Sequence, residues 1–312
     1  MSDLQNPIFH DESQAREWLE SQIWPDGPFC PHCGSTEATS LHGEAHRPGL
    51  YQCNEKECRK QFTVTVGTLF ERSKIPLSKW LMATYLLSAS KKGMSTRQLA
   101  RMLSLPVKTA WFMTHRIREA MRETNPGPLG GEGKTVEADE TYISGIKWVY
   151  HNEKGWVRER KKGIEQEKVI ALVERGGKAR SFHVPRVNAK TVRNILVTQI
   201  DRKSDLMTDE LKVYTKAGRE FARHETVNHS IEEYVRGDAG TQVIENYFSI
   251  FKRGLTGIYQ HVGPQHLKRY LCEFDFRYNT RHLDDHERTA EALKGIQGKR
   301  LTYRRTDEAR YA

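Results

Sequence analysis

The sequence contains no apolar run near the roughly 20 residues that a membrane-spanning helix needs. Its first residues, Met1 to Gln5, have neither the basic nor the apolar segment of a secretory signal, so we expect a protein that is not exported. Internal repeats and low-complexity tracts are also missing. With 312 residues, of which 37% are hydrophobic and 29% charged, the chain is typical of a globular protein with two or three domains.

Acidic residues are in short supply: 40 Asp and Glu face 50 Lys and Arg, which leaves a net charge of +10. A basic surface can simply be a solvated one. It also suits a polyanionic partner, because each phosphate that a protein neutralises releases counterions. The charge therefore favours a nucleic-acid partner without establishing one.

Cysteine is scarce, and four of the five cysteines form two pairs. Cys30 and Cys33 are separated by two residues, Cys53 and Cys58 by four, and Cys272 stands alone. In a chain without an export signal this pattern indicates a metal site rather than disulfides. Four thiolates at about 2.3 Å would enclose a tetrahedral Zn²⁺, which would supply folding energy to a small, loop-rich segment. A redox dithiol is the alternative, but no thioredoxin-like context surrounds the first pair.

Hydrophobic periodicity and breaker residues divide the chain into segments. A short helix precedes the cysteine-rich segment, three helices follow, and a linker rich in Pro and Gly leads to alternating strands and helices. The pattern predicts a multidomain α/β protein. The expected segments are 1–24 (N-terminal helix), 25–70 (zinc ribbon), 75–124 (helix-turn-helix), 125–134 (linker), 135–285 (core of alternating strands and helices) and 286–312 (charged, peripheral tail).

The three expected helices resemble a DNA-reading motif. A helix over 78–92, a short helix after Ser95, a turn at Pro106 and a longer helix over about 107–121 predict a helix-turn-helix, whose last helix enters the major groove. The alternative is a packed helical connector with ordinary surface charge. The candidate DNA-binding residues are Lys108, Thr109, His115, Arg116 and Arg118.

Two acidic residues end apolar strands, and a third lies on a later helix. Asp139 and Asp209 are the strand residues, and Glu245 flanks the apolar stripe of a helix over 241–255. Lys252 follows Glu245 by nearly two helical turns, so both point the same way. If the strands are neighbours, the three carboxylates can hold two divalent cations, the arrangement that cuts and rejoins phosphodiesters. Taken singly, each acid could be a surface or capping residue.

Strand alternation separates Asp139 from its neighbour. Glu137, Asp139 and Thr141 share one face of the expected strand, whereas Glu140 is on the other. We therefore do not expect Glu140 to share an ion with Asp139.

These residues stand in segments that resemble bacterial insertion-sequence transposases of the IS1595 type, with an ISXO2-like DDE domain. The resemblance implies an RNase H-like mixed-sheet core, DNA cleavage and strand transfer with Mg²⁺ or Mn²⁺, Asp139 and Asp209 as metal ligands, and Lys252 as the basic residue. Family members often carry Asn where this chain has Gln242. We assign the third ligand to Glu245, because a carboxylate binds a hard cation better than an amide does. The segments are CPHCG, YQCNEKECRKQFTVTVGTLF, VEADETYISG, TDELKVY, TQVIENYFSIFKRGL and HLKRYLCEFDFRYNTR, which together span residues 30–281.

The resemblance also implies partners. They are double-stranded DNA, as the element's terminal inverted repeats and as target, and a second copy of the chain in a homodimer or larger assembly in the bacterial cytoplasm, at the nucleoid. A basic loop with Arg160, Lys161 and Lys162 could track the DNA backbone or be a solvated hairpin. Two alternatives stay open: a DNA-binding regulator with an inactive core, which has no need of three acids, and a structure-selective nuclease without strand transfer.

Overall fold

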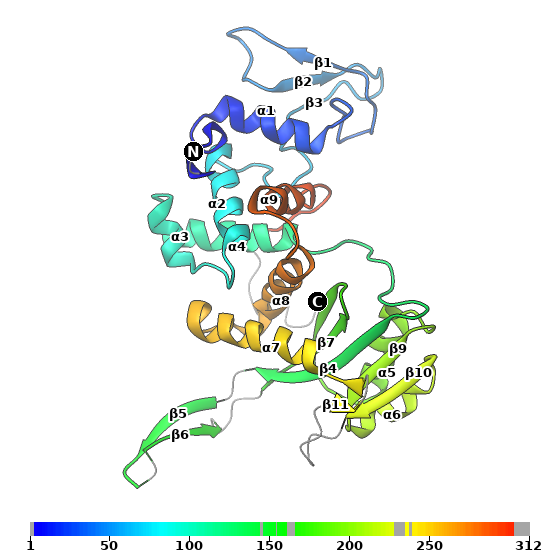
Figure 1. Ribbon diagram of the computed structural model, residues 1–312. Helices are drawn as coiled ribbons and strands as arrows, with labels where there is room; N and C mark the ends of the chain where they lie inside the picture. The colour runs from blue at the N-terminus through cyan, green and yellow to red at the C-terminus, as the bar shows by residue number, and fades with distance from the viewer. Residues whose placement is uncertain are drawn as a thin grey trace. The chain divides into compact units, whose positions relative to one another are not determined.

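The chain folds into two compact units (Figure 1). One consists of residues 3–124 with 280–302, and the other of residues 125–279. Within the part of the chain that is described, no helix is both long and apolar enough to cross a bilayer. The computed structural model describes residues 3–143, 146–153, 155–160, 166–227, 235–236 and 239–302.

The first unit begins with a helix and a small antiparallel sheet in the order β1-β2-β3. Trp24, at the end of the helix, packs edge-on against Tyr51 and Phe62, with ring centres 5.4 and 5.9 Å away. So small a sheet buries little apolar surface, and it therefore depends on this aromatic cluster and on its cysteines. The elements are α1 (Glu12–Ile23), β1 (Ala38–Leu41), β2 (Leu50–Cys53) and β3 (Gln61–Phe62).

Three helices follow, as expected. The hydroxyl oxygen of Ser95 accepts a hydrogen bond from the backbone N–H of Gln98 over 3.2 Å and thereby caps the second helix. Pro106 directly precedes the third helix, where its fixed φ suits the turn. The helices are α2 (Leu77–Ala89), α3 (Thr96–Met102) and α4 (Val107–Ala120).

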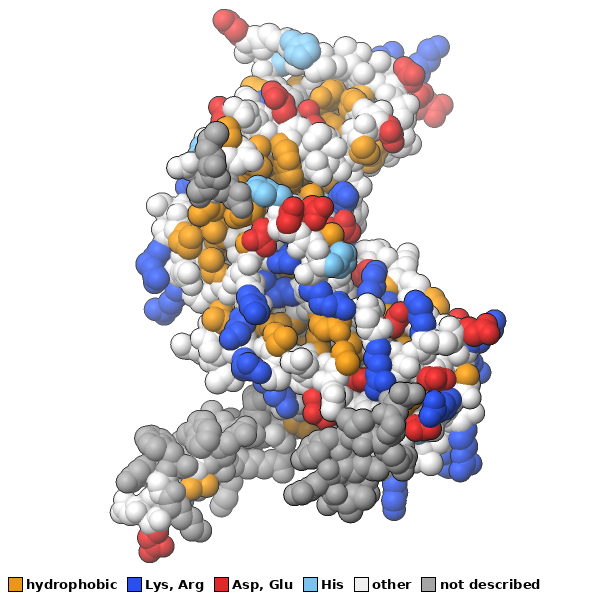
Figure 2. Space-filling model, in the orientation of Figure 1, with side chains coloured by type: hydrophobic (Ala, Val, Ile, Leu, Met, Phe, Trp, Pro, Cys, Tyr) orange, Lys and Arg blue, Asp and Glu red, His pale blue; other side chains and the backbone are white. Residues whose placement is uncertain are grey.

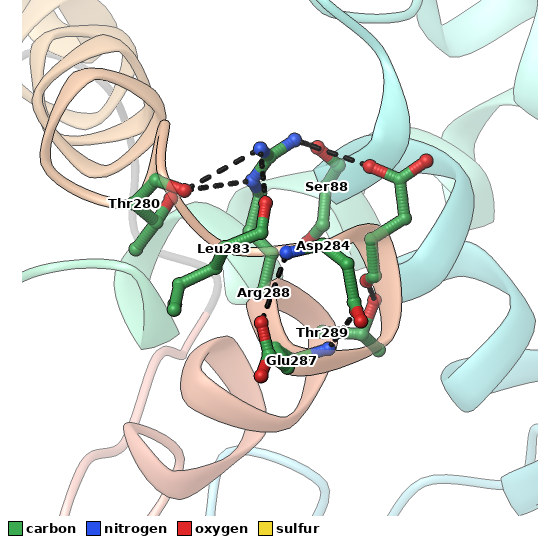
Figure 3. Close-up of polar contacts among 8 residues, drawn as sticks. Ser88, Thr280, Leu283, Asp284, Glu287, Arg288 and Thr289 are labelled. Atoms are coloured by element: carbon green, nitrogen blue, oxygen red, sulfur yellow. Dashed lines mark hydrogen bonds and ion pairs between the residues drawn. The ribbon is translucent and has the colours of Figure 1, made fainter.

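The C-terminal residues return to this unit, and the structure here differs from the expected peripheral tail. Helix α9 (Asp285–Lys294) begins with a capping box between Asp284 and Glu287. Arg288 donates to the backbone oxygens of Ser88 in α2 and of Leu283 (Figure 3). The charged residues of this segment misled the prediction because an amphipathic helix can carry them on its solvent side. Its buried residues are Thr289, Ala292, Leu293 and, just beyond it, Ile296.

A five-stranded sheet in the order β10-β9-β4-β7-β8 forms the centre of the second unit. β4, β7 and β8 are successively antiparallel, whereas β9 runs parallel to β4, and β10 parallel to β9. Three antiparallel strands followed by two parallel ones make the mixed sheet of an RNase H-like core, so the predicted fold class is confirmed. The strands are β4 (Thr135–Ile143), β7 (Glu167–Glu174), β8 (Ala179–Val184), β9 (Asp205–Asp209) and β10 (Arg223–Val227).

Helices cover both faces of this sheet. Val136 and Ala138 of β4 pack with α5 and α6 residues in one core, and Val169 and Ala171 of β7 pack with α7 and α8 residues in another. Alternate residues of each strand therefore enter different cores. The helices are α5 (Ala189–Gln199), α6 (Lys212–Gly218), α7 (Gln242–Gly254), the π-helical turn η4 (Leu255–Tyr259) and α8 (Pro264–Asn279). Two short antiparallel pairs complete the unit: β5 (Ile146–His151) with β6 (Gly155–Arg160), and β11 (Val235–Arg236) with β12 (Ala239–Gly240).

Helix α8 covers the edge strand β8. Asn279 accepts from the backbone N–H of Ala179 over 2.7 Å, and Asp275 accepts from the backbone N–H of Ser181 over 3.0 Å. The hydroxyl of Tyr247 also donates to Asp275, over 2.6 Å. Asn279 and Asp275 therefore bind backbone N–H groups that an open edge strand would offer to another strand. Burial raises the pKa of Asp275 to about 6, although its hydrogen bonds act in the opposite direction.

Candidate active site and metal centres

Asp139 and Asp209 lie at the same edge of the sheet. β4 and β9 are parallel and pair as far as Ala138 and Thr208, so each acid is the next residue of its strand. One ligand oxygen of each lies within 4.8 Å of the other, as the sequence predicts for neighbouring strands. Asp209 also accepts from the backbone N–H of Leu211 over 3.1 Å. Leu211 itself is the N-cap of α6, so Asp209 is not the cap of that helix.

Glu140 belongs to the same group, contrary to the expectation from strand alternation. Its carboxylate offers an oxygen within 4.8 Å of those of Asp139 and Asp209. β9 stops pairing with β4 after Ala138, whereas β7 continues to Ile143. The side of β4 that β9 leaves open can therefore be reached from both faces of the strand.

Burial and mutual repulsion favour the protonated form of these acids. The pKa of Asp139 is raised from 3.8 to about 7, first by burial and then by the negative charges of Glu140 and Asp209. Burial also raises the pKa of Glu140, and a hydrogen bond from Tyr214 offsets part of that change. Three carboxylates this close are costly to ionise together, and a divalent cation would remove the repulsion. An all-oxygen donor set suits Mg²⁺ or Mn²⁺.

Glu245 and Lys252 lie on one continuous helix, α7, and both are exposed. The hydroxyl of Thr241 donates to Oε1 of Glu245 over 3.1 Å. Among the described acids, Glu245 is not within the 4.8 Å group, but its negative charge contributes to the raised pKa of Asp139. The Lys252 ammonium lies 5.9 Å from the ring centre of Phe248, within cation–π range. The catalytic roles of Glu245 and Lys252 stay predictions.

Two buried residues that sequence reasoning missed support these acids. Tyr214 in α6 is fully buried, and its hydroxyl donates to Oε2 of Glu140 over 2.8 Å. Glu137 in β4 is also fully buried and holds Arg175 and the backbone N–H of Ile244. Tyr214 resembles any core residue of an amphipathic helix. Glu137 carries the same signal as Asp139, an acid in an apolar strand, but its partner 107 residues away is not visible in the sequence.

The four paired cysteines come together in the first unit. Their sulfur atoms lie within 4.8 Å of one another, with 3.7 Å from Cys30 to Cys58 and 3.6 Å from Cys33 to Cys53. A disulfide would need about 2.05 Å. Four sulfurs at about 2.3 Å from a tetrahedral ion are about 3.8 Å apart. Gly34, at φ +82°, turns the chain so that its backbone N–H donates a hydrogen bond to the backbone oxygen of Cys30 over 2.8 Å. The cluster therefore fits Zn²⁺.

The five candidate DNA-binding residues of α4 differ in exposure. Lys108 is exposed, and Thr109 and Arg116 are half-buried. His115 and Arg118 are only 1% and 0% exposed. A side chain without exposed surface cannot reach a phosphate or a base edge, so the structure contradicts the prediction for these two. It stays a prediction for the other three.

The predicted basic loop is only partly described. Arg160 ends β6, but its side chain lies outside the described part, as do residues Lys161 and Lys162 entirely. On the face shown in Figure 2, Lys and Arg side chains are scattered with Asp and Glu side chains among them. A role for this loop on DNA stays a prediction.

Two family models match the chain. The ISXO2-like transposase domain matches residues 128–279, which include the Asp139, Glu140 and Asp209 cluster, and the transposase zinc-ribbon domain matches residues 10–61. The chain is also similar to a Halobacterium salinarum protein described as an uncharacterized protein in transposable element ISH50. The two are 29% identical over 280 residues, which cover 86% of this chain and 91% of the relative.

Solved structures resemble the chain only weakly. The Mos1 strand transfer complex matches with a TM-score of 0.31 and 14% identity, covering 72% of this chain and 76% of the other. The mariner Mos1 paired end complex with Mg matches with a TM-score of 0.29 and 16% identity, covering 74% and 82%. Likenesses this weak carry no argument about this chain, and the RNase H-like assignment rests on its own strand order.

Proposed function

Because the chain belongs to the IS1595 family of insertion-sequence transposases, we propose that it binds the ends of an insertion sequence, cleaves a phosphodiester there and transfers the strand into target DNA in an Mg²⁺-dependent reaction. One observation carries this proposal. Asp139, Glu140 and Asp209 offer three carboxylate oxygens within 4.8 Å at the end of two parallel strands.

Asp139, Asp209 and Glu245 would hold the cations, with Glu140 as a further oxygen donor beside them. When bound, two divalent cations lower the pKa of an attacking water and stabilise the oxygen that leaves. Asp139 must lose its proton before it can bind a cation. Its raised pKa supports this role, because a bound cation would offset the cost of ionising a buried acid beside two others. The 3′-hydroxyl released by cleavage then takes the place of water and attacks a phosphorus atom of target DNA. One phosphodiester breaks as another forms, so no ATP is needed.

The remaining predicted residues would hold DNA. Lys252 lies two helical turns beyond Glu245 on α7, where its ammonium can bind a phosphate next to the scissile one. The zinc ribbon and the α3–α4 pair would recognise the terminal repeats, with Zn²⁺ as a structural ion. A homodimer or larger assembly would bring two ends together. An enzyme that acts in this way on chromosomal DNA would work in the cytoplasm, at the nucleoid.

A strand-transfer assay tests the proposal. Labelled element-end DNA, Mg²⁺ and a second duplex are mixed with the protein, and joined products are expected. Nicking without joining would instead indicate a nuclease, and binding without either would indicate a regulator. Asp139→Asn should abolish cleavage and joining and keep DNA binding. Asp205→Asn is the matched control, because Asp205 lies at the opposite end of β9 and should be dispensable for chemistry.

A further inference from the structure

A buried carboxylate outside the metal cluster links its first strand to the helix that carries Glu245. Glu137 lies two residues before Asp139 on β4 and is 0% exposed. A buried charge is costly unless it is paired and hydrogen-bonded. Both oxygens of Glu137 have partners: Oε1 accepts from Nε of Arg175 over 2.7 Å, and Oε2 accepts from the backbone N–H of Ile244 over 2.9 Å.

Arg175 extends this link to the segment that enters α7. It follows β7, and its backbone N–H donates to the oxygen of Thr135 over 3.0 Å. Its guanidinium donates to Glu137 and, over 2.9 Å, to the backbone oxygen of Gly240. Glu137 and Arg175 therefore join β4, the β7–β8 turn and the start of α7.

Glu137 does for α7 what an N-cap side chain usually does. Thr241 is the N-cap residue, and a threonine there normally accepts from an N–H of the first turn. Thr241 makes no such cap bond. The N–H of Ile244, in that first turn, is bound instead by Glu137, whose negative charge also suits the positive end of the helix.

Because Glu137 binds the N–H of Ile244, the Thr241 hydroxyl can make a different hydrogen bond. It donates to Oε1 of Glu245 over 3.1 Å, and Thr241 itself is only 1% exposed. The carboxylate of Glu245 thus receives a hydrogen bond from a fixed donor. Glu137 holds the residue just before Glu245, and the Thr241 hydroxyl holds Glu245 itself.

We propose that Glu137 and Arg175 are positioning residues, which hold the start of α7 against β4 so that Thr241 aims Glu245 at the metal site of Asp139. The inference rests on the proposed function, since it assigns Glu245 to that site. Residues that orient metal ligands in this way typically change metal affinity or activity by about 10–100-fold when they are replaced.

Glu137→Gln tests the inference in the full-length protein. Gln has the same shape but brings a donor to a position where two donors already point, so one of the two bonds is lost. We expect faster amide hydrogen exchange at Ile244, unchanged exchange at Phe251 in the last turn of α7, and a rise of about 10–100-fold in the Mg²⁺ concentration for half-maximal cleavage. Unchanged exchange and an unchanged Mg²⁺ requirement would overturn the inference.

A matched control separates positioning from general stability. Glu273 is also fully buried and pairs with an arginine, Arg277, over 2.5 Å, within α8. Glu273→Gln should lower the thermal midpoint and leave the Mg²⁺ requirement as in the wild type. An equal rise in that requirement for Glu273→Gln and Glu137→Gln would contradict positioning.

A second variant covers the case in which Glu137→Gln does not fold. Thr241→Val replaces the hydroxyl by a methyl group of similar size. It should raise the Mg²⁺ requirement while Ile244 exchange stays slow, and a wild-type requirement would count against the inference. If the wild type itself never cleaves element-end DNA, the proposed function fails. The exchange of Ile244 still decides whether Glu137 holds α7.

Discussion

Tyr214 donates its hydroxyl hydrogen to Oε2 of Glu140 across 2.8 Å, from a position in α6 with no exposed surface. The bond holds a carboxylate of the Asp139, Glu140 and Asp209 group and lowers the pKa that burial raises. We predict that Tyr214→Phe raises the Mg²⁺ concentration for half-maximal cleavage by about tenfold, as expected for a residue that orients a ligand. It should also cost about 1 kcal/mol of unfolding free energy. Magnesium titrations and denaturant unfolding measure the two effects.

Tyr247→Phe is the control for this prediction. Tyr247 is also buried, and its hydroxyl donates to Asp275 over 2.6 Å rather than to the cluster. This variant should lose a similar amount of stability and keep the wild-type Mg²⁺ requirement. If Tyr214→Phe behaves in the same way, the hydroxyl serves stability alone.

The raised pKa of Asp139 predicts how the metal-free protein responds to pH. The pKa is about 7 in the folded protein and near 3.8 when unfolded, so folding favours the protonated acid. The stabilisation that protonated Asp139 contributes is fully present below its pKa in the unfolded protein, near 3.8, and is lost as pH rises through about 7. With no Mg²⁺ added, the thermal midpoint of Asp139→Asn relative to wild type should therefore improve between about pH 4 and pH 7 and level off above.

Asp275 has a raised pKa of about 6 and acts with the same sign, but it is present in both proteins and cancels in the comparison. Magnesium should diminish the wild-type loss at higher pH, because the cation favours ionised Asp139. A constant difference between the two proteins across this range would refute the assignment.

The cysteine cluster predicts one zinc ion per chain. Because the small sheet depends on the ion, a strong chelator or Cys53→Ser should unfold the ribbon and leave the five-stranded sheet folded. Elemental analysis after purification under reducing conditions measures the stoichiometry, and amide exchange in β2 and β7 reports each sheet. Cys272→Ser, outside the cluster, should keep the zinc. Protein that folds normally without zinc would rule out a structural ion.

Helix α9 predicts that the C-terminal segment stabilises the first unit. Arg288 donates to the backbone oxygens of Ser88, Thr280 and Leu283 (Figure 3), and Arg288→Ala would remove these bonds. We expect a loss of about 2–3 kcal/mol, from several bonds of about 1 kcal/mol each. Thermal unfolding measures this loss of stability, and amide exchange in α2 shows whether it affects the first unit. Lys294→Ala, on the exposed side of the same helix, should change stability by less than about 0.5 kcal/mol. Equal stability of both variants would indicate a dispensable tail.

Features that depend on neighbours along the chain were predictable. The spacing of Cys30 and Cys33 suits a metal knuckle because two ligands from one tight turn reach the same ion. Asp139 and Asp209 were found because an acid that ends an apolar strand needs a partner or an ion. The stripe of α7 placed Glu245 and Lys252 on one helix, since 3.6 residues per turn is a local property.

Features that depend on where distant segments of the chain meet were not predictable from the sequence. Glu140 joins Asp139 because β9 stops pairing one residue earlier, and alternation along β4 contains no information about that end. Composition suggested a peripheral tail where α9 packs, because charge describes only the solvent side of a helix.

The amino-acid order by itself determined the two cysteine pairs, the two strand-end acids and the α/β character, since each follows from spacing and periodicity within a few residues. Only the tertiary structure decided that Glu140 belongs to the cluster, that Tyr214 orients it and that Glu137 caps α7 from 107 residues away. Those contacts exist because the sheet brings remote backbone segments within hydrogen-bond reach, which no local pattern records.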